Sequence, residues 1–303
     1  MRNTFIQTLL ENAKKDPNIV FITGDLGFGV IEDFQKQLPN QFINAGVSEQ
    51  AMMGMAAGIA STGKRVFVYS IGNFPTLRCL EQIRNDVCLM KNPVVIVSVG
   101  AGYSYGSQGY THHALEDIAV MRALPNMNIY IPADSIESKS ITNYLCKTKT
   151  PSYLRLGKAG EPILTNDNSK PISNEIIDIR SGDDGTILFV GPIGKRALAA
   201  AEILDQMNIK VSVASVPFAT DLDLGYLKNA AVKGPIITLE EHSKRGGFGS
   251  IILEALHQLD VTYKLKIVAS TQQNLSEIGS QDYLQVKNGL DEKSIVEAFN
   301  SFR

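Results

Sequence analysis

Residues 42–61 read FINAGVSEQAMMGMAAGIAS, and this stretch contains the unit from which we predict the fold. The apolar run 42–45 predicts a short buried strand, and the glycine-containing segment 46–50 predicts a loop. Small and apolar residues at helical spacing over 50–61 predict a helix. A strand, a short loop and a helix in this order form the repeating unit of α/β proteins with parallel sheets.

The same alternation of strand and helix recurs along the first half of the chain. Short β-branched runs predict further strands at 20–23, 66–69, 94–99, 129–131 and 153–156. Helical spacing of the apolar residues between them predicts helices at 77–89, 115–124 and 136–146. The predicted strands are continuously apolar, as expected when helices cover both faces of a parallel sheet. We therefore predict an α/β fold built from doubly wound open sheets.

The alternation stops at a polar segment and then starts again, which predicts two domains. Residues 163–175 read ILTNDNSKPISNE, a composition that favours a linker. They are followed by predicted strands at 186–190, 210–214, 236–239 and 264–268 and helices at 195–207, 222–231 and 248–259. For 303 residues, at about 150 residues per domain, two domains are also the expected number. We predict a first domain over 1–165, a linker over 166–184 and a second domain over 185–303.

The composition argues against several classes of protein. The 29 Lys and Arg residues nearly balance the 31 Asp and Glu residues, so the charge gives no indication of nucleic-acid or membrane-surface binding. The most apolar run, 93–102, is too short to span a bilayer, and residues 1–11 resemble a helix face rather than a signal peptide. Three cysteines without CxxC spacing favour reduced thiols over disulfides or a zinc site. We expect a soluble protein of the cytoplasm.

In open parallel sheets ligands bind at the carboxyl ends of the strands, so the loops after the strands are candidate binding segments. Four of them carry useful side chains: GDLGFG at 24–29, GVSEQ at 46–50, SIGNFP at 70–75 and YSYGSQGYTHH at 103–113. Glu49 stands at the start of a predicted helix, where a carboxylate also stabilises the helix dipole. The small residues behind it, at 52–60, permit close packing against another subunit. The residues alone leave open whether Glu49 is functional or only a helix-start carboxylate.

Several other polar residues suit the binding of a small ligand. His112 and His113 are adjacent, so they cannot both bind one metal ion from a helix, and we do not predict a zinc site. A loop histidine among hydroxyl groups suits substrate binding or proton transfer. Arg155 and Lys158, at the end of a predicted strand, either bind a phosphate or carboxylate or lie in solvent. Asp25, in a glycine-rich turn, is open to a binding or a structural interpretation.

Three segments resemble, in the same order, segments of transketolases and 1-deoxyxylulose-5-phosphate synthases. INAGVSEQAMMGMAAG at 43–58 resembles the pyrimidine-binding segment of that family, and GSQGYTH at 106–112 is similar to its later G-x-D-G-x-T-H loop. TLEEHSKRGGFGS at 238–250 resembles the strand, loop and helix of its C-terminal domain. The resemblance covers essentially the whole chain and implies a pyrimidine-binding domain followed by a transketolase C-terminal-type domain. It implies a transferase that moves a two-carbon ketol unit between sugars or sugar phosphates.

The resemblance also implies roles for individual residues. Glu49 matches the carboxylate that activates thiamine diphosphate through its pyrimidine ring, and His112 matches a substrate-facing histidine, so both are implied catalytic residues. The implied cofactor-binding residues are Asp25, Leu26, Gly46, Val47, Glu49 and Phe74, and Phe74 is the one that matches a stacking aromatic. The implied substrate-binding residues are Gln108, His112, His113, Arg155 and Lys158. The family has Asp where Gln108 stands and Arg where Lys158 stands, so we expect an altered choice of sugar.

An absent motif implies a partner. The family binds Mg²⁺ and the diphosphate through a GDG motif on a separate domain, and this sequence contains no GDG. The resemblance therefore implies a split enzyme whose partner subunit carries the diphosphate-binding domain and holds Mg²⁺, with no metal ligand in this chain. It further implies a homodimer of this chain within an α2β2 heterotetramer. Two alternatives stay open: the β-subunit of a 2-oxo-acid dehydrogenase, disfavoured by the loop at 106–113, and a non-catalytic subunit of the same fold.

Overall fold

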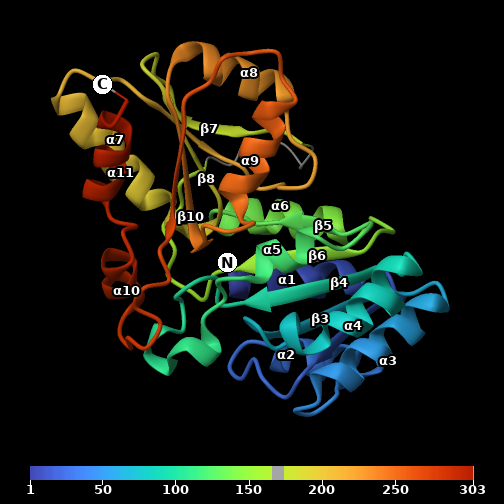
Figure 1. The fold of residues 1–303 in the computed structure, drawn as a ribbon. Coiled ribbons are helices and arrows are strands. Elements are labelled where there is room, and N and C mark those ends of the chain that lie inside the picture. Colours follow the sequence, from blue (N-terminus) through green and yellow to red (C-terminus); the bar gives the residue numbers. More distant parts are fainter. Residues whose placement is uncertain (166–173, 303) are drawn as a thin grey trace.

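A six-stranded parallel sheet forms the centre of the first domain in the computed structural model, which describes residues 1–165 and 174–302 (Figure 1). Its strands are β1 (Ile19–Thr23), β2 (Phe42–Asn44), β3 (Arg65–Ile71), β4 (Val94–Val99), β5 (Asn128–Tyr130) and β6 (Ser152–Leu156). They lie in the order β2-β1-β3-β4-β6-β5, and every neighbouring pair is parallel. The predicted α/β fold is confirmed for this domain.

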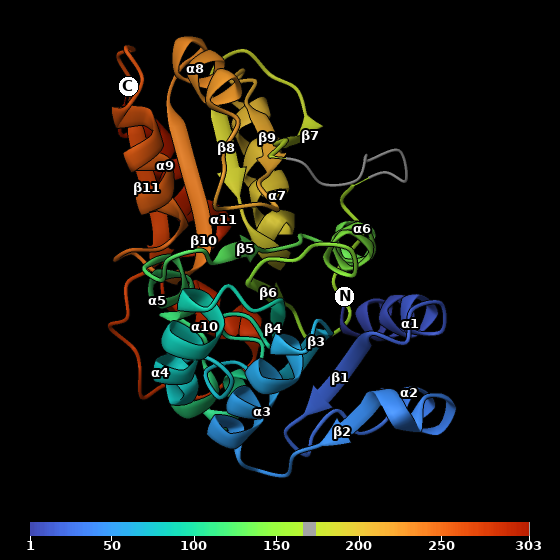
Figure 2. The same cartoon turned by 90° about the vertical axis from the view of Figure 1, so that its right-hand side faces the viewer.

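Helices cover both faces of this sheet because successive side chains of a strand point to opposite sides. One hydrophobic core contains Ile19 and Phe21 of β1 with residues of α1 (Arg2–Ala13), α2 (Glu32–Gln37) and α6 (Ser135–Leu145). The other core contains Val20 and Ile22 with residues of α3 (Glu49–Ser61), of α5 (Asp117–Arg122) and of the π-helix Ile83–Leu89 that continues α4 (Leu80–Gln82). Figure 2 shows α1 and α2 on one side of β1 and α3 and α4 on the other, which is the doubly wound arrangement that we predicted.

The second domain repeats this architecture with a five-stranded sheet in the order β11-β10-β8-β9-β7. Its strands are β7 (Ile177–Arg180), β8 (Thr186–Phe189), β9 (Ser212–Ser215), β10 (Ile236–Ser243) and β11 (Leu265–Ser270). Helices α7 (Gly194–Gln206) and α11 (Glu292–Asn300) share a core with one face of this sheet. Helices α8 (Leu224–Lys233) and α9 (Phe248–His257) share a core with the other face. The short helix α10 (Gln281–Lys287) packs instead on the loop after β4.

The structure contradicts the predicted linker over part of its length. Residues 166–173 lie outside the described residues, but residues 177–180 form β7, which pairs antiparallel with β9 at the edge of the sheet. The sequence there reads IDIR, an alternation of apolar and polar residues that is too short to distinguish from the polar segment before it. A second difference concerns β10, which runs to Ser243 instead of ending at residue 239. Glu240, Glu241 and His242 therefore lie in a buried strand.

The two domains share one continuous hydrophobic core and several backbone contacts. The core that contains α3 also contains residues of α8 and α9. At the junction, the backbone N–H of Ile131 donates to the carbonyl of Pro217 at 2.8 Å, and that of Ala219 donates to the carbonyl of Ile129 at 3.0 Å. These contacts, with an isolated β-bridge between Tyr130 and Phe218, hold the second domain against β5, the edge strand of the first sheet.

Glu137 is an ionisable side chain enclosed beside this junction. It belongs to α6 and is 1% exposed. One carboxyl oxygen accepts a hydrogen bond from the backbone N–H of Ala133 at 2.6 Å, and the other has no hydrogen-bond partner among the described residues. Burial raises the pKa of Glu137 to about 7. The folded chain therefore keeps a proton that the unfolded chain releases near pH 4.5.

We predict that Glu137→Gln removes a pH-dependent loss of stability. Because the pKa is raised in the folded state, the contribution of Glu137 is fully present below pH 4.5 and is lost as the pH rises to about 7. Relative to Glu137→Gln, the free energy of unfolding of the wild type should fall by about 3 kcal/mol across this range. Urea denaturation followed by circular dichroism at several pH values measures it. Glu202→Gln, on the exposed face of α7, is the control and should follow the wild type; equal slopes for all three proteins would contradict the prediction.

Candidate functional site

The carboxyl ends of β1 and β2 meet at one edge of the first sheet, and Asn44 joins the loops that follow them. Its Oδ1 accepts hydrogen bonds from the backbone N–H of Asp25 at 3.1 Å and of Gly46 at 3.0 Å. Its Nδ2 donates to Oδ1 of Asp25 at 2.9 Å. The carbonyl of Leu26 accepts from Oγ1 of Thr23 at 2.9 Å. The predicted residues Asp25, Leu26 and Gly46 thus lie in one connected group, and Asn44, which the sequence did not single out, connects them.

Glu49 stands at the wall of a cavity beside these loops. It is the first residue of α3, and its side chain is only 4% exposed. The cavity has a volume of about 600 Å³ and is lined by Val47, Ser48, Glu49, Gln50, Ala51 and Arg78. Val47, another predicted residue, is 74% exposed. A nearly buried carboxylate that borders a cavity of this size is well placed to meet a bound ring.

Arg78 links Glu49 to Phe74. Its Nη1 donates to Oε2 of Glu49 at 3.1 Å, and its Cζ lies 4.0 Å from the centroid of the Phe74 ring. The side chain of Arg78 is 49% exposed, so the ion pair is screened by water and contributes little to stability. Arg78 is absent from the predicted site residues because a single arginine in a helix-like segment matches no motif. A flat cation therefore occupies the space between the carboxylate and the aromatic face.

His112 approaches the same aromatic ring from the loop after β4. The two ring centroids are 5.2 Å apart and the rings meet edge to face. Nδ1 of His112 lies 3.0 Å from Oγ1 of Thr111. Burial, together with the charge of Arg78, lowers the pKa of His112, which favours the neutral imidazole. The structure thus brings three predicted residues, Glu49, Phe74 and His112, together around Arg78.

Two predicted substrate-binding residues lie on the exposed side of this loop. Gln108 and Lys158 are both exposed. Nζ of Lys158 lies 4.9 Å from the centroid of the Tyr105 ring, so Lys158 borders the loop that carries Gln108 and His112. An amide and an ammonium group in this position can both reach a ligand from solvent.

The structure contradicts two other substrate-binding predictions. Arg155 is 1% exposed, because β6 runs beneath the second domain and encloses the guanidinium. His113 is also 1% exposed, and its ring packs edge-on against Tyr103 with the centroids 5.1 Å apart. Neither side chain reaches the surface of this chain, as a residue that binds a ligand from solvent would have to do.

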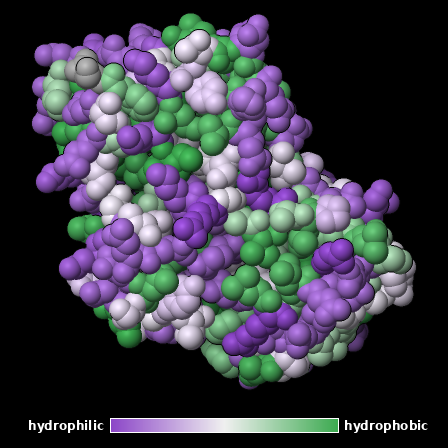
Figure 3. Space-filling model, in the orientation of Figure 1, coloured by the Kyte–Doolittle hydropathy of each residue, from purple (hydrophilic) through white to green (hydrophobic). Residues whose placement is uncertain are grey.

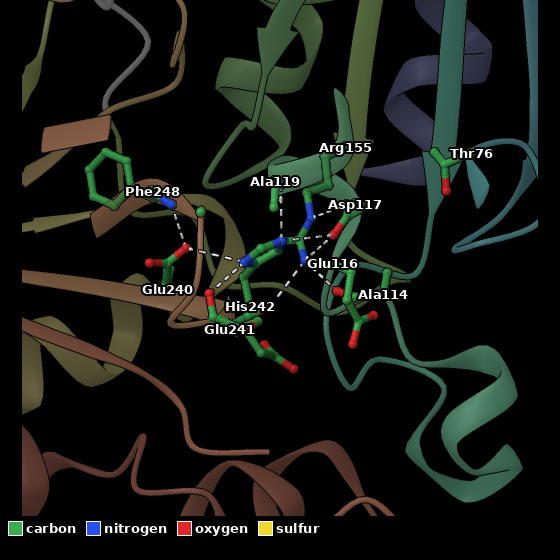
Figure 4. Close-up of polar contacts among 12 residues, drawn as sticks. Thr76, Ala114, Glu116, Asp117, Ala119, Arg155, Glu240, Glu241, His242 and Phe248 are labelled. Carbon is green, nitrogen blue, oxygen red and sulfur yellow. Dashed lines mark hydrogen bonds and ion pairs between the residues drawn. The ribbon is translucent and has the colours of Figure 1, made fainter. Parts of the chain in front are cut away.

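Arg155 instead belongs to a buried group of charges between the domains (Figure 4). Its Nε donates to Oδ2 of Asp117 at 2.6 Å, and the hydroxyl of Tyr153 donates to the same oxygen at 2.5 Å. Burial by itself would raise the pKa of Asp117, but the charge of Arg155, together with smaller contributions from His242 and from the hydrogen bonds of Arg155 and Tyr153, outweighs it and the pKa is lowered. His242 lies with its Nε2 3.8 Å from Oδ1 of Asp117, and burial lowers its pKa to about 4. The group is therefore an ion pair of Arg155 and Asp117 beside a neutral histidine.

Three further observations describe the chain. All three cysteines are buried free thiols, as predicted. Within residues 1–165 and 174–302, no group of three or more His, Cys, Asp or Glu side chains is placed to hold a metal ion. No helix in these same two ranges combines the length and the apolar character that a membrane crossing requires.

Family profiles and relatives match the chain over nearly its full length. The profile described as transketolase, pyrimidine binding domain, matches residues 1–160, and the profile described as transketolase, C-terminal domain, matches residues 175–295. A subunit of an apulose-4-phosphate transketolase from Phocaeicola vulgatus is 35% identical over 297 residues, which cover 97% of this chain and 94% of that protein. A 6-deoxy-6-sulfo-D-fructose transketolase subunit from Clostridium sp. is 32% identical, with coverage of 98% and 92%.

A solved structure matches the chain equally well. It is described as a split gene transketolase, inactive beta4 tetramer, and it has a TM-score of 0.90 at 31% sequence identity. The match covers 99% of this chain and 97% of that one. Both domains and their relative arrangement are therefore shared with that structure.

We predict that Arg155 and Lys158 differ sharply in their effect on stability. Arg155→Met should lower the free energy of unfolding by about 3–5 kcal/mol, because it leaves the carboxylate of Asp117 buried without its cation. Lys158→Met is the control: it removes an exposed cation three residues away and should change that energy by less than about 0.5 kcal/mol. Urea denaturation followed by circular dichroism measures both, since the chain has no tryptophan to report by fluorescence. Similar effects of the two substitutions would show that Arg155 is not a structural ion-pair residue.

Proposed function

This chain belongs to the transketolase family, and we propose that it is the separate subunit of a split, thiamine-diphosphate-dependent transketolase. In this proposal the chain supplies the pyrimidine-binding side of the cofactor site and part of the sugar site. The enzyme transfers a two-carbon ketol unit between sugars or sugar phosphates. The names of the relatives support this, since each describes a transketolase subunit with a sugar derivative as its substrate.

The observation that carries the proposal is the space between Glu49 and Phe74. An aminopyrimidine ring requires a carboxylate at its ring nitrogen and an aromatic face on which to stack. Glu49 and Phe74 meet both requirements, and the flat guanidinium of Arg78 already satisfies the two contacts at once. Because the pair of Arg78 with Glu49 is weak, a ring can take its place at small cost. The residues present therefore fit the pyrimidine end of thiamine diphosphate.

The other predicted residues, apart from Arg155 and His113, then each have a task in the proposed reaction. Thiamine diphosphate, when bound, supplies the nucleophilic carbon that carries the two-carbon unit. Glu49 holds and releases a proton at the pyrimidine nitrogen, and the neutral imidazole of His112 moves a proton at a sugar oxygen. Gln108 and Lys158 bind the sugar, Lys158 as a point charge for a phosphate or another anion. The cofactor-lining residues are Asp25, Leu26, Gly46, Val47 and Phe74.

We further propose that a partner subunit completes the cofactor site. The sequence contains no GDG motif, so Mg²⁺ and the diphosphate are assigned to the partner, in an α2β2 complex. The decisive experiment mixes the chain with that partner, thiamine diphosphate and Mg²⁺, and offers either a ketose with an aldose or a 2-oxo acid. Ketol transfer supports the proposal. Decarboxylation of the 2-oxo acid would favour a dehydrogenase β-subunit, and inactivity with both substrate pairs would favour a non-catalytic subunit.

We predict that Glu49→Gln and His112→Ala affect different steps. The amide of Glu49→Gln has nearly the shape of the carboxylate but cannot carry the proton, so turnover in the assembled complex should fall by about 10²- to 10⁴-fold. Exchange of the C2 proton of the bound cofactor should slow with it. His112→Ala should lower turnover while C2 exchange stays within about twofold of the wild type, because His112 acts on the sugar. Deuterium exchange at C2 measured by NMR separates the two. Wild-type exchange in Glu49→Gln would mean that Glu49 is only a helix-start carboxylate.

Self-association of the chain through α3 is the second part of the proposed assembly. Gly54 and Gly58 lie on α3, and a Cβ added to either would meet no atom within 4 Å. The exposed large apolar side chains of α3 and of the segment after α4 are Met55, Leu89 and Met90. Figure 3 shows hydrophobic residues interspersed with hydrophilic ones on the face of the first domain that is turned toward the viewer. The related split transketolase is described as a beta4 tetramer, which supports association of such chains with each other.

We predict that Gly58→Arg disrupts this association without harming the fold. Arginine is a better helix former than glycine and meets open space here, so the monomer should fold as before. In a close contact between helices the added side chain should weaken association by about 10- to 100-fold, as overpacking does elsewhere. Sedimentation at tens of micromolar measures the oligomer. Asn229→Arg, which adds the same charge on the exposed face of α8, is the control. Unchanged sedimentation of Gly58→Arg would exclude α3 from the interface.

A further inference from the structure

We propose that Glu241, in the C-terminal domain, is a positioning residue for the substrate loop, defined here as residues 103–112. The proposal rests on the proposed function, because that function assigns Gln108 and His112 of this loop to the sugar. Glu241 does not itself reach the cavity beside Glu49. It acts on the sugar site by holding the loop at its first residue, Tyr103.

The carboxylate of Glu241 is enclosed and surrounded by donors. Glu241 is 2% exposed, and its Oε1 accepts a hydrogen bond from the backbone N–H of Tyr103 at 2.5 Å. Nε2 of Gln281 donates to both carboxylate oxygens, at 3.1 and 2.9 Å, and Nε2 of Gln285 donates to Oε2 at 2.9 Å. Figure 4 shows this carboxylate pointing away from Asp117 and Arg155. Four hydrogen bonds to one enclosed carboxyl group therefore join the start of the loop to β10 and α10.

The loop lies so close to Glu241 that only glycine fits beside it. Gly102 precedes the loop with a φ of +59°, and a Cβ added there would be 2.4 Å from Cγ of Glu241. Farther along, the carbonyl of Gly106 accepts a hydrogen bond from the backbone N–H of Gly279 at 3.3 Å. A Cβ on Gly106 would be 2.6 Å from the carbonyl oxygen of Gly279. Glu241 and the segment around α10 thus form one continuous surface on which the loop packs.

Two further contacts tie the ends of the loop to the same strands. The hydroxyl of Tyr103 is hydrogen-bonded to Oγ of Ser270 at the end of β11. At the other end, Nη2 of Arg155 donates to the carbonyl of Ala114 at 2.7 Å and to the carbonyl of Glu241 at 3.0 Å. Gly102 and Ala114 also form an isolated β-bridge that closes the base of the loop. The base of the loop is therefore held at one end by Glu241 of β10 and at the other by Arg155 of β6, which also binds the backbone of Glu241.

The contacts of Glu49 are independent of this arrangement. Glu49 begins helix α3 and its carboxylate pairs with Arg78, whereas Glu241 contacts the start of the loop after β4 and helix α10. Loss of Glu241 should therefore misplace the groups that handle the sugar and leave cofactor activation intact. A misplacement of about 1 Å can reduce a rate by roughly 10²-fold, so a positioning residue can have a large effect without touching the substrate.

The first test uses the chain alone and does not depend on activity. In hydrogen-exchange mass spectrometry, Glu241→Ala should speed amide exchange of residues 103–112 by about tenfold or more, since their anchor is lost. Glu241→Gln should have a smaller effect. The amide oxygen of the new side chain can still accept from the backbone N–H of Tyr103, and the side-chain amide of Gln281 can rotate so that its oxygen accepts from the new NH₂ group. Glu240→Gln is the matched control: Glu240 is equally buried but accepts from Phe248 and Gly249 at the start of α9. It should leave exchange of the loop unchanged.

The second test uses the assembled complex with thiamine diphosphate and Mg²⁺. Glu241→Ala should raise the KM for the sugars by about tenfold or more, with C2 exchange of the cofactor within about twofold of the wild type, and Glu241→Gln should recover part of the loss. If amide exchange of residues 103–112 is unchanged in both Glu241 variants, the proposal is overturned. It is also overturned if Glu240→Gln speeds exchange of these residues as much as Glu241→Ala does. If Glu241→Ala does not fold, Glu241→Gln decides by the same readout. Absence of ketol transfer in the wild type would refute the proposed function alone, since the exchange experiment would still test the anchor.

Discussion

The ion pair between Arg155 and Asp117 is the contact on which the arrangement of this molecule depends. Both side chains are enclosed, and charges in such a place are tolerated only when each has its partners. The pair joins the end of β6 to the start of α5, and the same guanidinium binds the carbonyl groups of Ala114 and Glu241. The side chain of Arg155 therefore fixes the relative positions of the first domain, the loop after β4 and strand β10.

Two arginines in this chain show how burial decides what an ion pair does. The guanidinium of Arg155 is 1% exposed and cannot leave its carboxylate without stranding a buried charge. The guanidinium of Arg78 is 49% exposed, so water can replace Glu49 as its partner. The pair of Arg155 and Asp117 is a fixed part of the fold, whereas the pair of Arg78 and Glu49 is an exposed contact that a ligand can displace. Under the proposed function, the distinction explains how a ring would enter the cavity beside Glu49 although the side chain of Arg78 lies there.

Part of the fold and of the candidate site could be predicted from the sequence, and the physical reasons differ from residue to residue. The doubly wound sheets could be predicted because continuous apolar runs alternate with helical spacing, and Glu49 could be singled out because it follows a strand and begins a small-residue helix. Arg155 could not be recognised as buried, since residue order does not show that a second domain covers the end of β6. Glu240 and His242 fall outside the predicted strand because charged side chains rarely occupy a buried strand. Arg78 and Asn44 act through partners distant in sequence, which no local pattern reveals.

The attachment of the loop at 103–112 has a consequence for how such enzymes diversify. Every hydrogen bond described for this loop and its base is made within one polypeptide, to β6, β10, β11 or the segment just before α10. Under the proposed function, the gene for this chain then encodes the specificity for the sugar, whereas a separate gene encodes the site that binds the diphosphate. A single diphosphate-binding subunit could serve several chains of this kind, and each combination would act on a different sugar with the same cofactor chemistry.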